Sequence, residues 1–352
     1  MIELRHDSLR FSFPEVHEDA RFSIDFQRTL RIPDDGSDYP LPAGLGRFPL
    51  RHVDDFGARV PQRWSARGGV LMPMYQAEAL WLNFNDRGYP FALKIAAGKI
   101  NAVTGKAWTT ELQHGPSPSL SRGDREGPVQ DYVVVGDQPW LDGFNVGEGR
   151  IRQFVAMPLG EGYTAEEQLT GRADTGGLQL LAYPMKAEKY EEIRRRAEER
   201  RHRAAGLALV MAAPPVDGWE MGLGAGGRMR QDISRSPYSA DVWDPEHASR
   251  CFVHIANSRQ WATITGEAPP MPPPGPEDYA RAGIPWFTYY AAGDIVAGSP
   301  ELASLASVAE VARDKGELLP DNDPIPIDRV VDLTPRHRPE PRVRVDEGPQ
   351  GW

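Results

Sequence analysis

The chain lacks the residues that would indicate a disulfide framework, a membrane span or a secreted protein. Its 352 residues include one cysteine, Cys251, which excludes an intramolecular disulfide and is typical of a reducing compartment. No apolar run approaches the roughly 20 residues that a membrane-spanning helix needs. The opening residues, MIELRHDSLRF, carry charges where a signal peptide would have its apolar region. We therefore expect a soluble, cytoplasmic protein with no membrane partner.

The sequence also lacks the short motifs of the common enzyme classes. No G-x-S-x-G, H-E-x-x-H, Walker A or kinase signature occurs in it. This absence lowers the expectation of catalysis but does not exclude it, because many active sites combine residues that lie far apart in sequence. The sequence leaves open whether the protein is an enzyme, and it indicates no particular cofactor.

Charge and composition narrow the class of protein further. The formal net charge is −10, from 50 acidic and 40 basic residues, so the protein is acidic and nonspecific nucleic-acid binding is disfavoured. Hydrophobic residues make up 40% of the chain, which is typical of a folded core. The 33 prolines and 35 glycines predict many turns and short elements rather than a helical bundle.

Short runs of strand-forming residues dominate the chain. Phe22, Ile24 and Phe26 alternate with other residues and would share one face of a strand. Turns at Ala97-Gly98 and around Gly147 would join neighbouring strands into hairpins. This pattern predicts a β-rich α+β fold, built as an antiparallel β-sandwich or a partly open barrel.

Three helices are expected beside the strands. Thr164 and Glu167 form a capping box that begins a short helix. Residues 185–205 predict a long charged helix. One interpretation is a basic patch that binds nucleic acid or an acidic partner. The other is a solvated helix that links two halves of the chain. The second interpretation is favoured because no aromatic residues interleave with its arginines. Ser299 would cap a C-terminal helix over 300–315.

The long charged helix suggests a division of the chain. We expect a β-rich N-terminal lobe at 1–184, a connecting helix at 185–206, and a C-terminal lobe with strands and one helix at 207–333. The polar, proline-bearing segment 334–352 is predicted to be a disordered tail. A single continuous domain with the helix packed across it is the alternative.

A glycine-rich segment is the first candidate site. Residues 222–227 match G-x-G-x-x-G, but no strand directly before and no helix directly after support a dinucleotide site. As a loop, the segment would turn its backbone N–H groups toward an anion beside two arginines. A tightly turned loop with surface arginines is the plainer alternative. The candidate ligand-binding residues are Gly224, Gly226, Gly227, Arg228 and Arg230.

A second candidate site lies around the single cysteine. His247, Cys251 and His254 have the spacing H-x3-C-x2-H. If 250–256 is a strand, Cys251 and His254 point to opposite faces, so they would not share a metal ion or act as a nucleophile–base pair. His247 would still reach Cys251 from the preceding loop. We therefore predict no metal site and keep these three residues as catalytic candidates, against the alternative of a buried thiol and a half-buried histidine.

Several segments resemble an uncharacterised family of bacterial, chiefly actinobacterial, and fungal proteins, and the resemblance spans most of residues 20–330. No activity is established for that family, so the resemblance implies no catalytic residue. The segments are GGVLMPMYQAEALWLNF, FALKIAAGKINAVTGKAW, QPWLDGFNVGEGRIRQFVAMPLGEGYTAEEQLTG and GGRMRQ…CFVHIANSRQWATITGE.

Three functional hypotheses follow. The first is a non-catalytic cytosolic binding or scaffold protein with a protein partner, for which exposed Trp140 and Trp286 would provide contacts. The second is an enzyme acting on a small anionic substrate that bears a phosphate or carboxylate, held by Arg228 and Arg230. The third is nucleic-acid or partner binding through the helix at 194–203. We rank them in that order.

Overall fold

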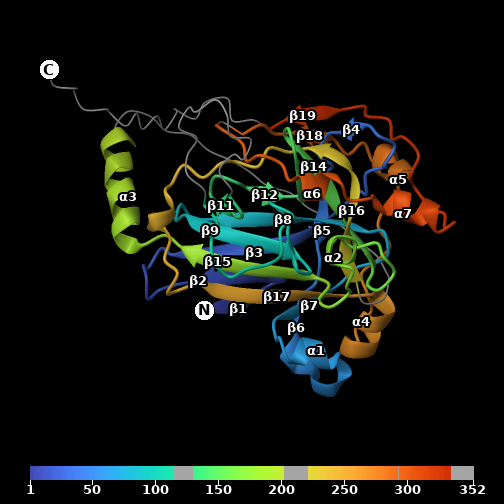
Figure 1. Cartoon of the computed structure of the whole chain (residues 1–352), viewed down its shortest axis with the longest axis horizontal. Coiled ribbons are helices and arrows are strands. Elements are labelled where there is room, and N and C mark those ends of the chain that lie inside the picture. The colour runs from blue at the N-terminus through green and yellow to red at the C-terminus, as the bar shows by residue number, and fades with distance from the viewer. Residues whose placement is uncertain (115–129, 202–220, 292, 334–352) are drawn as a thin grey trace.

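The computed structural model describes residues 1–114, 130–201, 221–291 and 293–333. The predicted tail at 334–352 lies outside the described residues, as do the end of the charged helix and residues 207–220 of the predicted C-terminal lobe. Within the described part, strands dominate and helices lie around them (Figure 1).

Most strands belong to one sheet of 17 strands. In chain order they are β1 (Ile2–Leu4), β2 (Ser8–Ser12), β3 (Arg21–Thr29), β4 (Asp38–Tyr39), β5 (Gly44–Arg47), β6 (Arg51–His52), β7 (Val70–Pro73), β8 (Ala79–Asp86), β9 (Phe91–Ala97), β10 (Ile100–Asn101), β11 (Val133–Val135), β12 (Trp140–Leu141), β13 (Gly143–Gly147), β14 (Arg150–Pro158), β15 (Leu178–Pro184), β16 (Met221–Arg230) and β17 (Ser249–Ala256). A separate parallel pair joins β18 (Trp286–Thr288) to β19 (Val330–Asp332).

The large sheet is mainly antiparallel. β8 lies between β3 and β14, β14 also pairs with β16, and β15 lies between β9 and β17. Two pairings are parallel, β16 with β4 and β17 with β7. The β-rich, antiparallel character predicted from the sequence is confirmed, and across the described residues the sheet does not close into a barrel.

Side-chain alternation explains why these segments are strands. In β3, Phe22, Ile24 and Phe26 are all buried on one face, as their period-two spacing predicts. Phe22 packs between two other rings, with its centroid 4.8 Å from that of Phe11 and 4.5 Å from that of Phe91. Such aromatic contacts across strands stabilise the pairing beyond the burial of apolar surface.

The strands of the proposed lobes share the sheet. β16 and β17 follow the charged helix in sequence, yet they pair with β14 and β15, which precede it. The expected boundary at 185–206 therefore separates, along the chain, strands that lie side by side.

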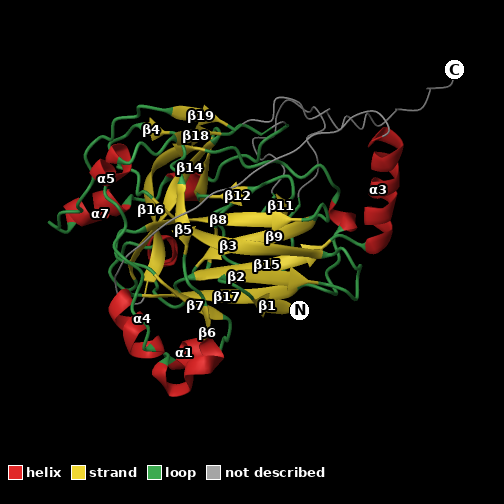
Figure 2. Cartoon of the chain, turned by 180° about the vertical axis from the view of Figure 1, so that it is seen from behind, coloured by secondary structure: helices red, strands yellow, loops and turns green. Residues whose placement is uncertain are grey.

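Apart from α3 the helices are short, and they lie around the sheet, as Figure 2 shows from behind. They are η1 (Val53–Arg59), α1 (Gln62–Ser65), α2 (Ala165–Thr170), α3 (Ala187–Arg201), η2 (Ala240–Val242), α4 (Ser258–Thr265), α5 (Pro276–Arg281), α6 (Pro300–Ala303) and α7 (Val308–Asp314). Among the helices of the described residues, none combines the length and apolar character needed to cross a bilayer.

Cap residues explain the outcome of two helix predictions, the short helix after Thr164 and the C-terminal helix over 300–315. The Thr164–Glu167 capping box begins α2, and Gly171 ends it in the left-handed conformation, as expected. The single C-terminal helix over 300–315 is wrong, since the chain forms α6 and α7 instead. Ser307 accepts from the backbone N–H of Glu310 in a second capping box, which begins a new helix there.

α3 lies within the segment 185–205 predicted as a charged helix, and it stands apart from the sheet at one end of the molecule (Figure 1). Its first turn is attached through Tyr190, whose ring centroid lies 4.2 Å from that of Tyr89. Further along, Glu192 and Arg196 form an i,i+4 ion pair with an O–N distance of 2.5 Å.

Candidate functional site

The glycine-rich segment is a strand and not the loop that the sequence suggested. Residues 222–227 lie inside β16, which pairs with β14 along almost its whole length. Backbone N–H groups of a paired strand take part in the ladder, so they do not form a concave nest for an anion. The loop prediction failed because glycine has a low strand propensity, which tertiary packing overrides here.

Close packing is the reason for glycine in β16. A Cβ atom at Gly224 would lie 2.6 Å from Cγ1 of Val308 and 2.8 Å from the carbonyl oxygen of Tyr163. At Gly227, a Cβ atom would lie 2.2 Å from the carbonyl oxygen of Pro33. All three distances are too short for a larger residue, so these glycines let neighbouring groups approach the strand closely.

The two candidate arginines of this strand have different surroundings. Arg228 forms an ion pair with Asp38, with 3.1 Å between Nε and Oδ1, and donates to the carbonyl oxygen of Gly36. Arg230 is exposed at the end of the strand. Because Asp38 already balances the charge of Arg228, these arginines and the glycines do not form a free anion site of the kind expected.

Cys251 lies in β17 and is buried. Burial raises the pKa of its thiol to about 12. A thiol is nucleophilic as the thiolate, so burial disfavours the reactive form of Cys251 at neutral pH. This matches the plainer alternative, a small buried side chain.

His254 is also buried, and burial lowers its pKa to about 4. Its Nε2 donates to the carbonyl oxygen of Gly68 over 3.0 Å, which fixes the neutral tautomer with the proton on Nε2. Its ring stacks on Trp64, with 4.8 Å between the centroids. His254 therefore anchors the turn that follows α1.

His247 lies before β17, and its Nδ1 is 2.8 Å from Oδ2 of Asp244. This hydrogen bond raises the pKa of His247. No contact joins His247 to Cys251 among the described residues. In that part of the chain, no three His, Cys, Asp or Glu side chains gather in a way that would hold a metal ion.

A cavity of about 240 Å³ lies on β15 and β17 and on the segments that border them. We call it the Arg67–Arg250 pocket. It combines three cationic side chains, two aromatic rings and two polar side chains, and its lining residues are Arg67, Lys99, Ala107, Trp108, Thr175, Gln179, Arg250 and Phe252.

Strands β15 and β17 contribute Gln179, Arg250 and Phe252 to this pocket. Side chains alternate along β17, so Arg250, Phe252 and His254 share one face. In the neighbouring strand β15, Gln179 stands directly opposite Phe252. The amide of Gln179 donates to the carbonyl oxygen of Gly98 and accepts from Nη2 of Arg250.

Aromatic rings hold Arg250 in place. Its guanidinium carbon lies 4.4 Å from the ring centre of Phe252 and 5.7 Å from that of Trp108. Cation–π contacts of this kind are worth roughly 0.5–2 kcal/mol, more where water is excluded. Gln179 and the two rings thus fix the position of the guanidinium, and its remaining N–H groups are not used by Gln179.

Arg67 enters the pocket from the turn between α1 and β7. Its guanidinium carbon lies 5.6 Å from the ring centre of Phe252, the same ring that Arg250 contacts. Gly69 has a φ of 89°, and a Cβ there would lie 2.2 Å from the carbonyl oxygen of Phe252. Only glycine allows this close approach, which brings Arg67 over β17.

The pocket carries excess positive charge. Lys99 is paired with Asp174 over 2.7 Å, whereas neither Arg67 nor Arg250 forms an ion pair with an acidic side chain among the described residues. Asp174 also lies near Arg67, which donates to its carbonyl oxygen, and the pKa of its carboxyl is lowered first by the hydrogen bond from Lys99 and also by the charge of Arg67. The pKa of Arg250 is lowered, first by burial and then by the charge of Arg67. Three positive charges thus lie around the pocket, with the single carboxylate of Asp174 near them in the described part of the chain.

Two donors of the pocket are left without acceptors. Nη1 of Arg67 and Nε1 of Trp108 are buried from solvent and have no hydrogen-bond partner among the described residues. Leaving a buried donor unsatisfied costs about 1–3 kcal/mol. Both donors line the same cavity, so one acceptor-bearing molecule in the pocket could satisfy them.

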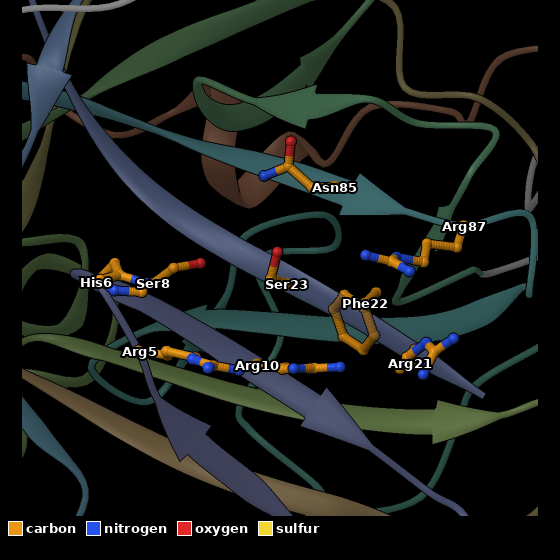
Figure 3. Close-up of a pocket in the computed structure, with 9 residues that line it drawn as sticks. All are labelled: Arg5, His6, Ser8, Arg10, Arg21, Phe22, Ser23, Asn85 and Arg87. Carbon is orange, nitrogen blue, oxygen red and sulfur yellow. The ribbon is translucent and has the colours of Figure 1, made fainter. Parts of the chain in front are cut away.

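A second concave region, of about 210 Å³, is formed by residues of β2 and β3 and of the segments next to them. We call it the Arg10–Arg21 groove, and Figure 3 shows its residues. It is lined by Arg5, His6, Ser8, Arg10, Arg21, Phe22, Ser23, Asn85 and Arg87.

No known protein family, curated protein or solved structure shows a significant match to the chain.

Sequence reasoning missed the residues of both concave regions. The alternation R-x-F-x-H in the predicted strand at 250–256 does place Arg250 and Phe252 on one face, and that signal was available. Arg67 and Trp108 had no such signal, because they reach the pocket from connecting segments. Trp286, expected to be exposed, is 2% exposed and belongs to the core.

Proposed function

We propose that this protein is a binding protein for a small anionic ligand, and that the Arg67–Arg250 pocket holds a phosphate or carboxylate group of that ligand. The observation that carries the proposal is the pair of buried, unsatisfied donors, Nη1 of Arg67 and Nε1 of Trp108, in a cavity whose two guanidinium groups form no ion pair with the described residues. Oxyanions accept several hydrogen bonds and balance the charge, which both features require.

Arginine suits such a role better than lysine. Its planar guanidinium presents parallel N–H groups that match the oxygens of a carboxylate or phosphate. Arg250 is held by Gln179 and by the rings of Phe252 and Trp108, so little side-chain entropy is lost when it binds. His254 contributes indirectly, since it anchors Gly68 beside Arg67.

Binding without catalysis is favoured over the enzyme hypothesis. Cys251 has a raised pKa and His254 a lowered one, so at neutral pH the thiol keeps its proton and the imidazole is neutral. His254 also uses its Nε2 proton in the bond to Gly68. The anionic ligand expected from the sequence is retained, with Arg67 and Arg250 in place of Arg228 and Arg230.

The finer expectations from the sequence belong to the same proposal. We propose that the sheet is arranged as a β-sandwich, that the protein works in the cytoplasm, and that it belongs to the family whose segments it resembles. Burial of every residue of β9 and β15 supports two packed layers. The single cysteine supports a reducing compartment.

Calorimetric titration with sodium phosphate and with sodium citrate, at constant ionic strength in a chloride buffer, tests the binding. We expect one of these probes to bind, and Arg250→Gln or Arg67→Gln to weaken it about tenfold or more, because each charged hydrogen bond is worth about 1.5–3 kcal/mol. Arg259→Gln, an exposed arginine on α4, is the matched control and should bind as the wild type does.

Trp108→Phe tests the unsatisfied donor directly. It keeps a ring in place but removes the indole N–H, so the affinity should fall while the unliganded protein is as stable as the wild type or more stable. Unchanged affinity in Trp108→Phe, Arg67→Gln and Arg250→Gln together, or no binding of either probe up to about 10 mM, would contradict the proposal.

A further inference from the structure

We propose that the Arg10–Arg21 groove is a second, separate anion site, which takes a small ligand carrying two or more linked phosphate groups. The groove lies on the face of β2 and β3 that points away from the core (Figure 3). It shares no lining residue with the Arg67–Arg250 pocket.

Strand register explains how the arginines come together. Arg10 of β2 stands opposite Ser23 of β3, and Ser12 stands opposite Arg21. Arg10 and Arg21 are therefore diagonal neighbours on one face, while Phe11 and Phe22 between them are buried on the other. Diagonal neighbours across antiparallel strands are within reach of long side chains.

Two further arginines extend the cluster. Arg5 precedes β2, and Arg87 follows β8, which pairs with β3. In Figure 3, Arg5 and Arg10 follow one another along β2, and Arg87 and Arg21 lie on either side of β3 near Phe22. The hydroxyl of Ser23 and the amide of Asn85 lie above β3 between them.

The charges in the groove are not balanced by the described residues. No ion pair involves Arg5, Arg10, Arg21 or Arg87 in that part of the chain, and Nε of Arg21 is buried without a hydrogen-bond partner. Glu3 stands opposite Arg10 in the register of β1, but it is exposed and forms no ion pair there. Asp25, the nearest acid of β3, is paired with Arg47 over 3.3 Å.

Most other arginines of the sheet have acidic partners. Arg28 is paired with Glu78, Arg51 with Glu267, and Arg150 with Asp38. A face that served only solubility would intersperse charges of both signs, because like charges held together are destabilising. Four unpaired arginines around one cavity, in a chain of net charge −10, indicate a built anion site.

The shape of the groove selects the ligand class. It is open and extends along β2 and β3, with guanidinium groups at both ends and the hydroxyl of Ser23 between them. The other polar side chains are engaged within the protein, since Ser8 donates to the carbonyl oxygen of Ile24 and Nδ2 of Asn85 donates to Asp25. One phosphate would use only part of the guanidinium groups, whereas a chain of linked phosphates would contact both ends. No aromatic ring is exposed for base stacking among the lining residues, since Phe22 is 2% exposed, which disfavours single-stranded nucleic acid.

Titration with inorganic tripolyphosphate and with orthophosphate, at one fixed low ionic strength, tests this site. We expect tripolyphosphate to bind at least about tenfold more tightly than orthophosphate, and the double variant Arg10→Gln/Arg21→Gln to lose about tenfold or more of that affinity. Arg250→Gln removes the other pocket, so tripolyphosphate binding that survives in it is assigned to the groove. Arg259→Gln is the matched control.

The fold of the double variant is checked by its urea midpoint, which should equal or exceed that of the wild type, because the substitutions relieve repulsion. Wild-type affinity of the double variant for tripolyphosphate would overturn the proposal, as would equal affinities for the two phosphates. A single-stranded oligonucleotide that displaces tripolyphosphate and binds more tightly would also overturn it. Loss of binding only in Arg250→Gln would place the anion in the first pocket alone.

Discussion

Asp142 has a buried carboxyl group, and no sequence pattern indicates this burial. It follows β12 and is 2% exposed, and its Oδ2 accepts from Nε2 of Gln231 over 2.6 Å. Burial without a cationic partner raises its pKa from 3.8 to about 7. The folded state therefore keeps a proton on Asp142 in a pH range where the unfolded chain has lost it.

We predict that this carboxyl makes the protein less stable as the pH rises from about 4 to about 7. In that window the folded state binds more protons than the unfolded state, so the free energy of unfolding falls with pH and levels off above the folded pKa. A shift of about three pKa units corresponds to about 4 kcal/mol. Asp142→Asn should remove this dependence and be more stable than the wild type at pH 8.

Urea unfolding at pH 5 and pH 8 measures the effect. Asp54→Asn, at an exposed acid of η1, is the control and should follow the wild-type pH dependence. If Asp142→Asn lost stability with rising pH as steeply as the wild type, the assignment to Asp142 would be wrong.

At the same scale, the sequence predicted some residue properties and missed others. It predicted that Cys251 and His254 point to opposite faces, because this follows from strand alternation alone. It did not predict the partner of Arg228, since Asp38 reaches it through the parallel pairing of β4 with β16. Long-range strand order, which a single sequence does not encode locally, decides which charges are balanced.

β16 shows how packing decides the role of an element. Its glycines were interpreted as a loop, yet they form a strand whose neighbours approach closely from both faces. By contrast, α2 was predictable, because its capping box and terminal glycine are local signals. The local hydrogen bonds of α2 could be inferred from the sequence, whereas the close contacts that make β16 a strand come from distant residues and could not.

We predict that Gly224→Ala destabilises the protein by about 1–3 kcal/mol, because the added methyl group would clash with Val308 and with the backbone of Tyr163. Gly293→Ala is the matched control. A Cβ at Gly293 meets no atom within 4 Å, so its effect should stay within about 0.5 kcal/mol. Urea midpoints of both variants provide the measurement, and equal stabilities would refute the packing argument for β16.

On the scale of the whole molecule, the sheet joins strands from both sides of the charged helix. β14 pairs with β16 and β15 pairs with β17, so main-chain hydrogen bonds join the two expected lobes to each other. The sequence suggested a boundary there because α3 is charged and carries few apolar residues. A composition change along the chain marks an exposed element, and it does not by itself mark a break between cores.

We predict a single cooperative unfolding transition in urea for the full chain. Tryptophan fluorescence and far-UV circular dichroism should give coincident curves, since neither set of strands would keep its partners after the other has unfolded. Two separated transitions would instead support independent lobes on either side of 185–206.

The parallel pairing of β7 with β17 has a consequence for biosynthesis. Arg67 precedes β7 and Arg250 lies in β17, so the pocket that we propose binds an anion is assembled from two distant parts of the chain. While the ribosome is still making the segment before residue 249, Arg67 has no counterpart, and the ligand has no complete site to occupy. Contacts between such distant residues form slowly and late. Ligand occupancy would thus distinguish finished molecules from nascent or truncated ones, and a ligand in the cell would protect only the former.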